Sequence, residues 1–162
     1  MKTAYLTAGV PTTSATLYWK MRFLVGDPAA VIEFDEDRTF PEAKKSTNAL
    51  SPKKPGHTRL LILRDIENER AARCAAADFV ACPADFTPEG GLSGDREIAT
   101  AQGVAEACRR AGVERIVSDR TLPLVYVSAL ADAGIECKCD VWRGVLERRS
   151  KDETELGYIR EA

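Results

Sequence analysis

The sequence predicts an α/β fold with a mixed central sheet of about five to six strands flanked by helices. Short apolar segments rich in β-branched residues alternate along the chain with segments whose apolar residues recur at helical spacing. Alternating strands and helices are typical of layered α/β domains. The 162 residues, 44% of them hydrophobic, are enough for one domain of ordinary size with its own core.

The N-terminal part of the chain predicts two strands and one helix. Residues 4–10 have the pattern of a short strand, and Thr13 or Ser14 can cap a helix that runs to Phe23. After a Gly-Asp-Pro turn, residues 29–34 have the β-branched and aromatic content of a second strand.

A polar stretch separates these elements from the centre of the predicted sheet. Residues 35–57 contain three prolines and four lysines, and we expect an exposed insertion that can hold a short hairpin. Residues 59–63 then form a continuous apolar run, which predicts a central strand buried on both faces. Asp65 is the expected N-cap of a helix that ends near Ala77.

The second half of the chain predicts three further strands and two helices. A short strand is expected at 79–82, and Asp95 is expected to cap the next helix. The strand at 115–118 is followed by a helix that ends before Gly134. Residues 135–141 form the last predicted strand.

The C-terminal segment predicts one more helix. Ser150 and Glu153 have the spacing of a capping box, and Leu156 and Ile159 share one face of the helix that follows. Nothing in the sequence is assigned to cover this apolar face. We therefore expect the chain to be part of a longer protein.

Composition argues against several classes of protein. The net charge of −2, without a basic stripe, is not that of a nucleic-acid binder. No apolar run approaches the ~18 residues of a membrane span, and the N-terminus lacks the apolar core of a signal peptide. We expect a cytoplasmic protein with neither nucleic acid nor membrane as a partner.

The metal-ligating and nucleophilic residues are few and scattered. Five cysteines and one histidine occur in the chain. Cys137 and Cys139 fall on one face of a strand, and we interpret them as buried small apolar residues rather than zinc ligands. His57 lies in a loop, so no self-contained metal site or His-based triad is expected.

Four blocks of sequence carry a resemblance to a known family. Residues 17–30 place aromatic residues and then an Asp-Pro pair ahead of a strand, and residues 62–71 end a strand and start a helix with Glu-x-x-Arg-Ala. Residues 112–135 form a helix–strand–helix–strand unit, and 149–162 contain Lys, Glu-Leu and Ile-Arg-x-Ala in that order. In this order the blocks resemble the N-terminal domain of the creatinase, prolidase and aminopeptidase P ("pita-bread") metallopeptidases.

The resemblance implies a fold and a division of the chain. It implies a ribonuclease-H-like, creatinase-type N-terminal domain at residues 1–149, with 35–57 as the exposed insertion. Residues 150–162 would begin the linker helix to a missing catalytic domain. That missing domain would hold two divalent metal ions (Mn, Co or Zn), and no cofactor is expected in this chain.

The resemblance also implies a role. The chain would be the non-catalytic part of an Xaa-Pro dipeptidase-, aminopeptidase- or creatinase-like hydrolase, contributing to homodimer formation and substrate access. The aromatic segment would supply either a substrate-gating lip or an interface, with plain core packing as the alternative, and its residues are Tyr18, Trp19, Arg22 and Phe23. Alternatives for the whole chain are a stand-alone binding or scaffold domain of the same fold and a small independent enzyme.

Two further hypotheses, a nuclease site and a phosphate-binding loop, have less support in the sequence. A nuclease would need carboxylates that converge on two metal ions, but the candidate acids fit local roles as caps and exposed helix residues. These acids are Asp65, Glu67, Glu69, Asp119 and Asp132. The glycine-rich stretch 90–94 lacks the Lys-Ser/Thr of a phosphate-binding loop and is interpreted as a flexible loop.

Overall fold

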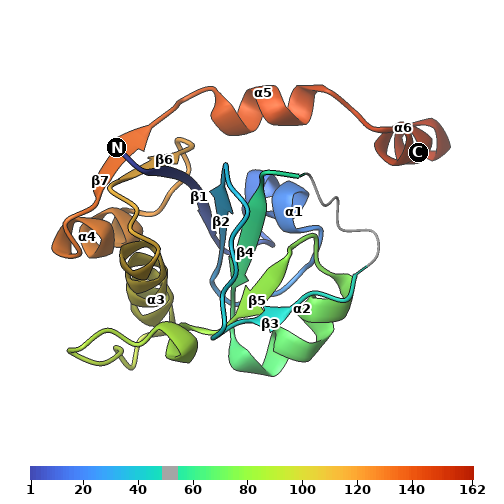
Figure 1. The fold of residues 1–162 in the computed structure, drawn as a ribbon. Coiled ribbons are helices and arrows are strands. Elements are labelled where there is room, and N and C mark those ends of the chain that lie inside the picture. Colours follow the sequence, from blue (N-terminus) through green and yellow to red (C-terminus); the bar gives the residue numbers. More distant parts are fainter. Residues whose placement is uncertain (49–54) are drawn as a thin grey trace.

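The computed structural model describes residues 1–48 and 55–162 and has a mixed seven-stranded sheet at its centre (Figure 1). The strand order is β3-β5-β4-β2-β1-β6-β7. The strands are β1 (Thr3–Gly9), β2 (Ala29–Phe34), β3 (Lys44–Lys45), β4 (Thr58–Ile62), β5 (Phe79–Ala81), β6 (Arg115–Ser118) and β7 (Glu136–Cys139).

Five of the strands share one direction. β4 and β5 pair in parallel, as do β1, β6 and β7, whereas β2 is antiparallel to both β1 and β4. The mixed α/β fold predicted from the sequence is therefore confirmed. The sheet exceeds the expected five to six strands because β3, a two-residue strand within the polar insertion, pairs antiparallel with β5 at one edge.

Helices cover both faces of the sheet. They are α1 (Ala15–Met21), α2 (Asn68–Cys74), α3 (Arg96–Arg110), α4 (Leu124–Asp132), α5 (Arg143–Arg149) and α6 (Glu153–Glu161). α3 and α4 pack against one face, in a core with Leu6, Ile32 and Ile116. α1 and α2 pack against the other face, over Val31 and Leu61. α5 runs across the domain, and α6 extends beyond it (Figure 1).

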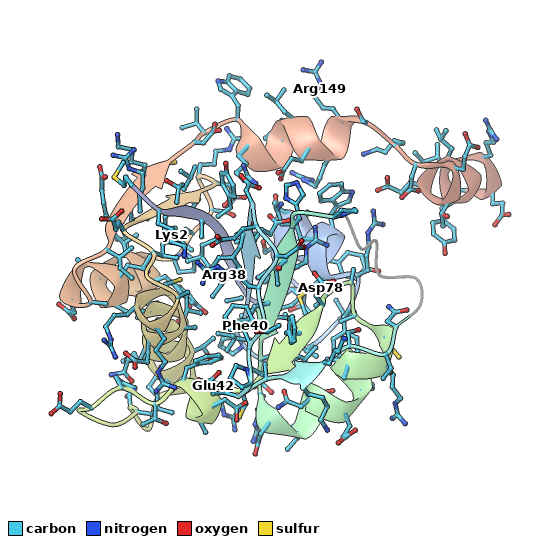
Figure 2. The ribbon with its side chains drawn as sticks, viewed as in Figure 1. Lys2, Arg38, Phe40, Glu42, Asp78 and Arg149 are labelled. Atoms are coloured by element: carbon cyan, nitrogen blue, oxygen red, sulfur yellow. The ribbon has the colours of Figure 1, made fainter. Side chains whose placement is uncertain are left out.

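The insertion contributes to the core, which corrects one expectation. Most of its described side chains are exposed, but Phe40 is only 7% exposed. Its ring lies 5.5 Å from that of Phe34, 5.6 Å from Phe79 and 6.3 Å from Phe86, centroid to centroid. Figure 2 shows Phe40 in the interior of the molecule. One large aromatic side chain thus anchors a polar segment, so the expectation of an exposed insertion is wrong at this position.

Both ends of helix α2 differ from the sequence prediction. Asp65 does not cap α2; it opens a 3-10 helical turn, Asp65–Glu67, and its Oδ1 accepts the N–H of Ile66 at 2.9 Å. α2 also ends at Cys74, before the expected end near Ala77.

The C-terminal capping box lies at Asp152 and Glu155, not at Ser150 and Glu153. Asp152 Oδ1 accepts the Glu155 N–H at 2.8 Å, and the Glu155 carboxylate accepts the Asp152 N–H at 3.1 Å. The register differs because α5, which the sequence analysis missed, continues to Arg149, so that Ser150 ends one helix instead of beginning the next.

Within the described ranges, none of the helices combines the length and apolar character needed to cross a membrane.

Candidate functional site

Helix α1 carries the aromatic segment that the sequence analysis singled out. Ser14 caps its start, with its Oγ accepting the Leu17 N–H at 3.3 Å, as one of the two predicted caps. The helix ends at Arg22, whose backbone has left-handed φ and ψ values of 48° and 35° and whose N–H donates to the Tyr18 carbonyl at 2.8 Å. This is the geometry of an αL helix end.

Trp19 and Arg22 meet on one carboxylate of helix α6. Trp19 Nε1 donates to Glu155 Oε1 at 3.0 Å, and Arg22 Nη2 lies 3.1 Å from the same oxygen. The Arg22 guanidinium also lies 5.6 Å from the Trp19 ring centroid. The hydrogen bond from the Asp152 backbone, with the charge of Arg22, lowers the pKa of Glu155. We call Trp19, Arg22 and Glu155 the α1–α6 contact.

The other two residues of the aromatic segment lie elsewhere. Tyr18 is 45% exposed at the surface of α1. Phe23 is buried in the core beneath α1 and α2, with the Arg70 guanidinium 4.4 Å above its ring. The structure therefore brings together Trp19 and Arg22, and places neither Tyr18 nor Phe23 with them.

A second feature, missed in the sequence, lies beneath helix α5. Tyr5, Glu33 and Arg59 are direct neighbours across β1, β2 and β4, so their side chains share the face of the sheet that α1 covers. Glu33 lies within 4 Å of cationic groups from α1, β4 and α5. We call this set the buried charge cluster; it consists of Lys20, Glu33, Arg59, Arg143 and Glu147.

The distances show that Lys20 joins the two acids of the cluster. Its Nζ lies 2.5 Å from Glu33 Oε2 and 3.0 Å from Glu147 Oε2, and its side chain is 2% exposed. Arg59 reaches Glu33 Oε1 at 2.8 Å. Arg143 lies 3.2 Å from Glu147 and 3.7 Å above the Tyr5 ring. Helix α5 is thus held to the sheet by a charge cluster in which Lys20 is buried and the other four side chains are 18–28% exposed.

Glu33 is the electrostatic centre of the cluster. Burial alone would raise its pKa, but the charges of Lys20 and Arg59 and their hydrogen bonds outweigh burial and lower the pKa from 4.5 to about 2. The carboxylate is therefore ionised at neutral pH. A charged residue in an otherwise apolar strand, and a lysine in an aromatic helix, were the sequence signals that could have revealed this cluster.

Gly144 allows α5 to approach α1 closely. A Cβ at this position would lie 2.6 Å from Thr16 Cγ2 and 2.9 Å from Asp119 Oδ2. Both Thr16 and Asp119 are buried. The glycine is therefore required by the close packing of the two helices rather than by an unusual backbone conformation.

The residues considered for metal or nucleophilic chemistry are dispersed. Across residues 1–48 and 55–162, no three His, Cys, Asp or Glu side chains form a group able to hold a metal ion. His57 Nδ1 lies 3.0 Å from Asp35 Oδ1, and Asp119 Oδ1 accepts hydrogen bonds from the backbone and hydroxyl of Thr121.

The cysteines match the expectation only in part. Cys82 and Cys108 are buried and Cys137 is half-buried, but Cys74 and Cys139 are exposed. The expectation of burial is wrong for Cys139 because β7 is the edge strand of the sheet.

The glycine-rich loop precedes α3, as predicted. The first turn of that helix is capped by its own residue Asp95, whose Oδ1 accepts the N–H groups of Glu97 and Ile98 at 2.9 and 3.0 Å. Together with α3 and α4, the loop lines a groove of about 680 Å³.

Comparison with known proteins gives a fold relationship. No family profile matches the sequence, and no curated protein matches it. Among solved structures, the fold is similar to "the aminopeptidase P, XAA-pro aminopeptidase from Streptococcus thermophilus". The TM-score is 0.54 with 14% identity, over 90% of this chain and 84% of that chain. The chain therefore has the mixed α/β fold found in that protein.

Proposed function

We propose that this chain is the non-catalytic N-terminal domain of an Xaa-Pro dipeptidase-, aminopeptidase- or creatinase-like metallohydrolase, and that it contributes to dimerisation and substrate access in the cytoplasm. The observation that carries the proposal is the fold shared with aminopeptidase P over 90% of the chain. The order of the four sequence blocks supports it independently. In this proposal two divalent metal ions, Mn, Co or Zn, belong to a C-terminal catalytic domain.

The C-terminal helices would connect the two domains. The buried charge cluster fixes α5 on the sheet, and the α1–α6 contact ties α6 to α1 through Glu155. Arg149 at the end of α5 points away from the domain (Figure 2). With both α5 and α6 in contact with the domain, the linker would hold a following domain in a defined orientation. A defined orientation is needed if both domains are to line one substrate cleft.

Exposed apolar residues support a homodimer. Among the described residues, five of the eleven exposed large hydrophobic side chains fall between positions 141 and 159. They are Val141, Trp142, Leu146, Tyr158 and Ile159. Val141 and Trp142 directly precede α5, Leu146 lies on α5, and Tyr158 and Ile159 lie on α6. Exposed apolar side chains concentrated in one such segment are typical of an interface. In this proposal a second copy of the chain covers them.

Replacement of Trp19 tests the role in substrate access. In this proposal the Trp19 indole forms part of a lip that narrows the entrance for substrate. In the parent enzyme, Trp19→Ala should therefore raise kcat/KM for longer peptides relative to a dipeptide several-fold, because removal of the indole widens that entrance. The measurement is the ratio of kcat/KM values over a series of Xaa-Pro peptides of increasing length.

Two matched variants make this test specific. Leu124→Ala removes an apolar side chain that is 81% exposed at the start of α4, outside both the α1–α6 contact and the proposed dimer interface, and it should leave the ratio unchanged. Glu155→Gln weakens the ion pair with Arg22 but keeps the bulk of Trp19, and it should also preserve the length preference. An unchanged ratio in Trp19→Ala would rule out gating by this residue.

A further inference from the structure

A small apolar pocket lies at the edge of the sheet where β4 and β5 end. Its volume is about 230 Å³. After β4 the chain passes through α2 on one face, and after β5 it enters α3 on the opposite face. Loops that diverge in this way leave a crevice beyond the carboxyl ends of parallel strands, which is where open α/β sheets bind ligands.

The wall of the pocket is mainly apolar. Side chains from the loop before β2, the loop after β5 and the start of α3 form it, namely Pro28, Pro83, Ala84, Leu92 and Ala99. Burial raises the pKa of the Cys82 thiol, which therefore lines the pocket as a neutral group. A cavity of about 150 Å³ can hold benzene, so this pocket has room for a branched aliphatic group of about five carbons.

Two arginines line the pocket, and most of their guanidinium N–H donors have no acceptor among the described contacts. Arg64 Nη1 lies 3.3 Å from Asp27 Oδ2, and Arg96 Nη1 lies 2.9 Å from Asp27 Oδ1. Asp27 thus contacts both guanidiniums at the pocket, one with each of its carboxylate oxygens. Among the contacts of the described residues, each guanidinium uses one of its five N–H donors here. The remaining donors suit a carboxylate, which guanidinium groups bind in a bidentate manner.

The net charge of the pocket does not explain why it would prefer a carboxylate. The pocket is also lined by Asp65, so its two arginines and two aspartates sum to zero. The Arg64 and Arg96 side chains are 38% and 63% exposed, so selectivity would arise from the directed, charge-assisted N–H donors that a carboxylate can accept while its apolar group lies against the apolar wall.

We propose that this pocket binds a small aliphatic carboxylate, with the branched apolar group against Pro28, Pro83 and Ala99 and the carboxylate on Arg64 and Arg96. The proposal concerns this chain alone and does not depend on the proposed function.

Titration of the isotopically labelled chain with isovalerate, followed by amide NMR shifts, tests this site. Isovalerate should give saturable shifts in residues 27–28, 64–65, 82–84 and 92–100, with a millimolar or lower Kd. Isovaleramide has the same shape without the charge, and it should bind about tenfold more weakly because charge-assisted hydrogen bonds are lost.

Three variants make the result specific. Arg96→Gln should reduce isovalerate affinity to about that of the amide, whereas Arg73→Gln, the same change on the exposed end of α2, should have no effect. Ala99→Leu should abolish binding of both ligands by filling the pocket. Shifts that do not saturate, equal affinity for acid and amide, or unchanged binding in Ala99→Leu would each overturn the proposal.

Discussion

Glu33→Gln should lower the free energy of unfolding at neutral pH by on the order of 3 kcal/mol, the largest single effect we expect in this domain. The drop in the pKa of Glu33 from 4.5 to about 2 corresponds to an energy of about this size. Glutamine keeps the shape of the side chain but leaves Lys20, 2% exposed, with Glu147 as its remaining acid. Urea unfolding followed by circular dichroism measures the difference.

The effect should depend on pH in a defined direction. Because the pKa of Glu33 in the folded state lies below 4.5, its stabilising contribution is complete above that pH and is lost as the pH falls toward 2. The difference between the natural chain and Glu33→Gln should therefore narrow in acid. Glu136→Gln, the same change on β7 at a side chain that is 46% exposed, should have little effect. Equal losses from both variants would contradict the account of the cluster.

Gly144→Ala should destabilise the domain by about 1–3 kcal/mol, because the added methyl group has no room between α5 and α1. Its Cβ would lie 2.6 Å from Thr16 Cγ2 and 2.8 Å from Thr16 Oγ1. α5 would have to move outward, and Arg143 and Glu147 would move with it. Urea unfolding should show the loss, and amide hydrogen exchange should show faster opening of α5.

Gly157→Ala is the matched control for this prediction. Gly157 lies within helix α6, and no atom is found within 4 Å of an added Cβ. Alanine is a better helix former than glycine, so this variant should be neutral or stabilising by up to about 1 kcal/mol. If Gly144→Ala proved as stable as Gly157→Ala, the close approach of α5 and α1 would be wrong.

Local signals predicted most of the sheet and the longest helix. Residues 29–34 and 115–118 are strands with the predicted bounds, because their β-branched content and flanking turns agree with their place in the sheet. Asp95 caps α3 as expected. In these segments local preference and tertiary packing favour the same structure.

Features that depend on distant partners were not predictable in this way. Lys44 and Lys45 have no strand pattern and become β3 only because β5 offers an open edge. Phe40 is buried because three aromatic rings from other elements surround it. The spacing of Ser150 and Glu153 fits a capping box, but α5 occupies the preceding residues and shifts the box to Asp152.

The candidate site shows the same division. The sequence identified Trp19 and Arg22 as notable, but their partner Glu155 lies more than a hundred residues away along the chain. The acids and bases of the buried charge cluster come from four separate elements, and only the folded chain places them together. The sequence shows that charged residues occur in apolar segments, but it does not show which of them pair with one another in the folded chain.

Capture of the native protein with an antibody against this chain, followed by an assay of Xaa-Pro peptide hydrolysis, tests the central claim most directly. The account predicts a polypeptide well above 17.7 kDa whose hydrolytic activity is lost with EDTA and restored by Mn²⁺ or Co²⁺. A captured polypeptide of 17.7 kDa, or a longer one that hydrolyses no Xaa-Pro peptide in the presence of these metals, would contradict it.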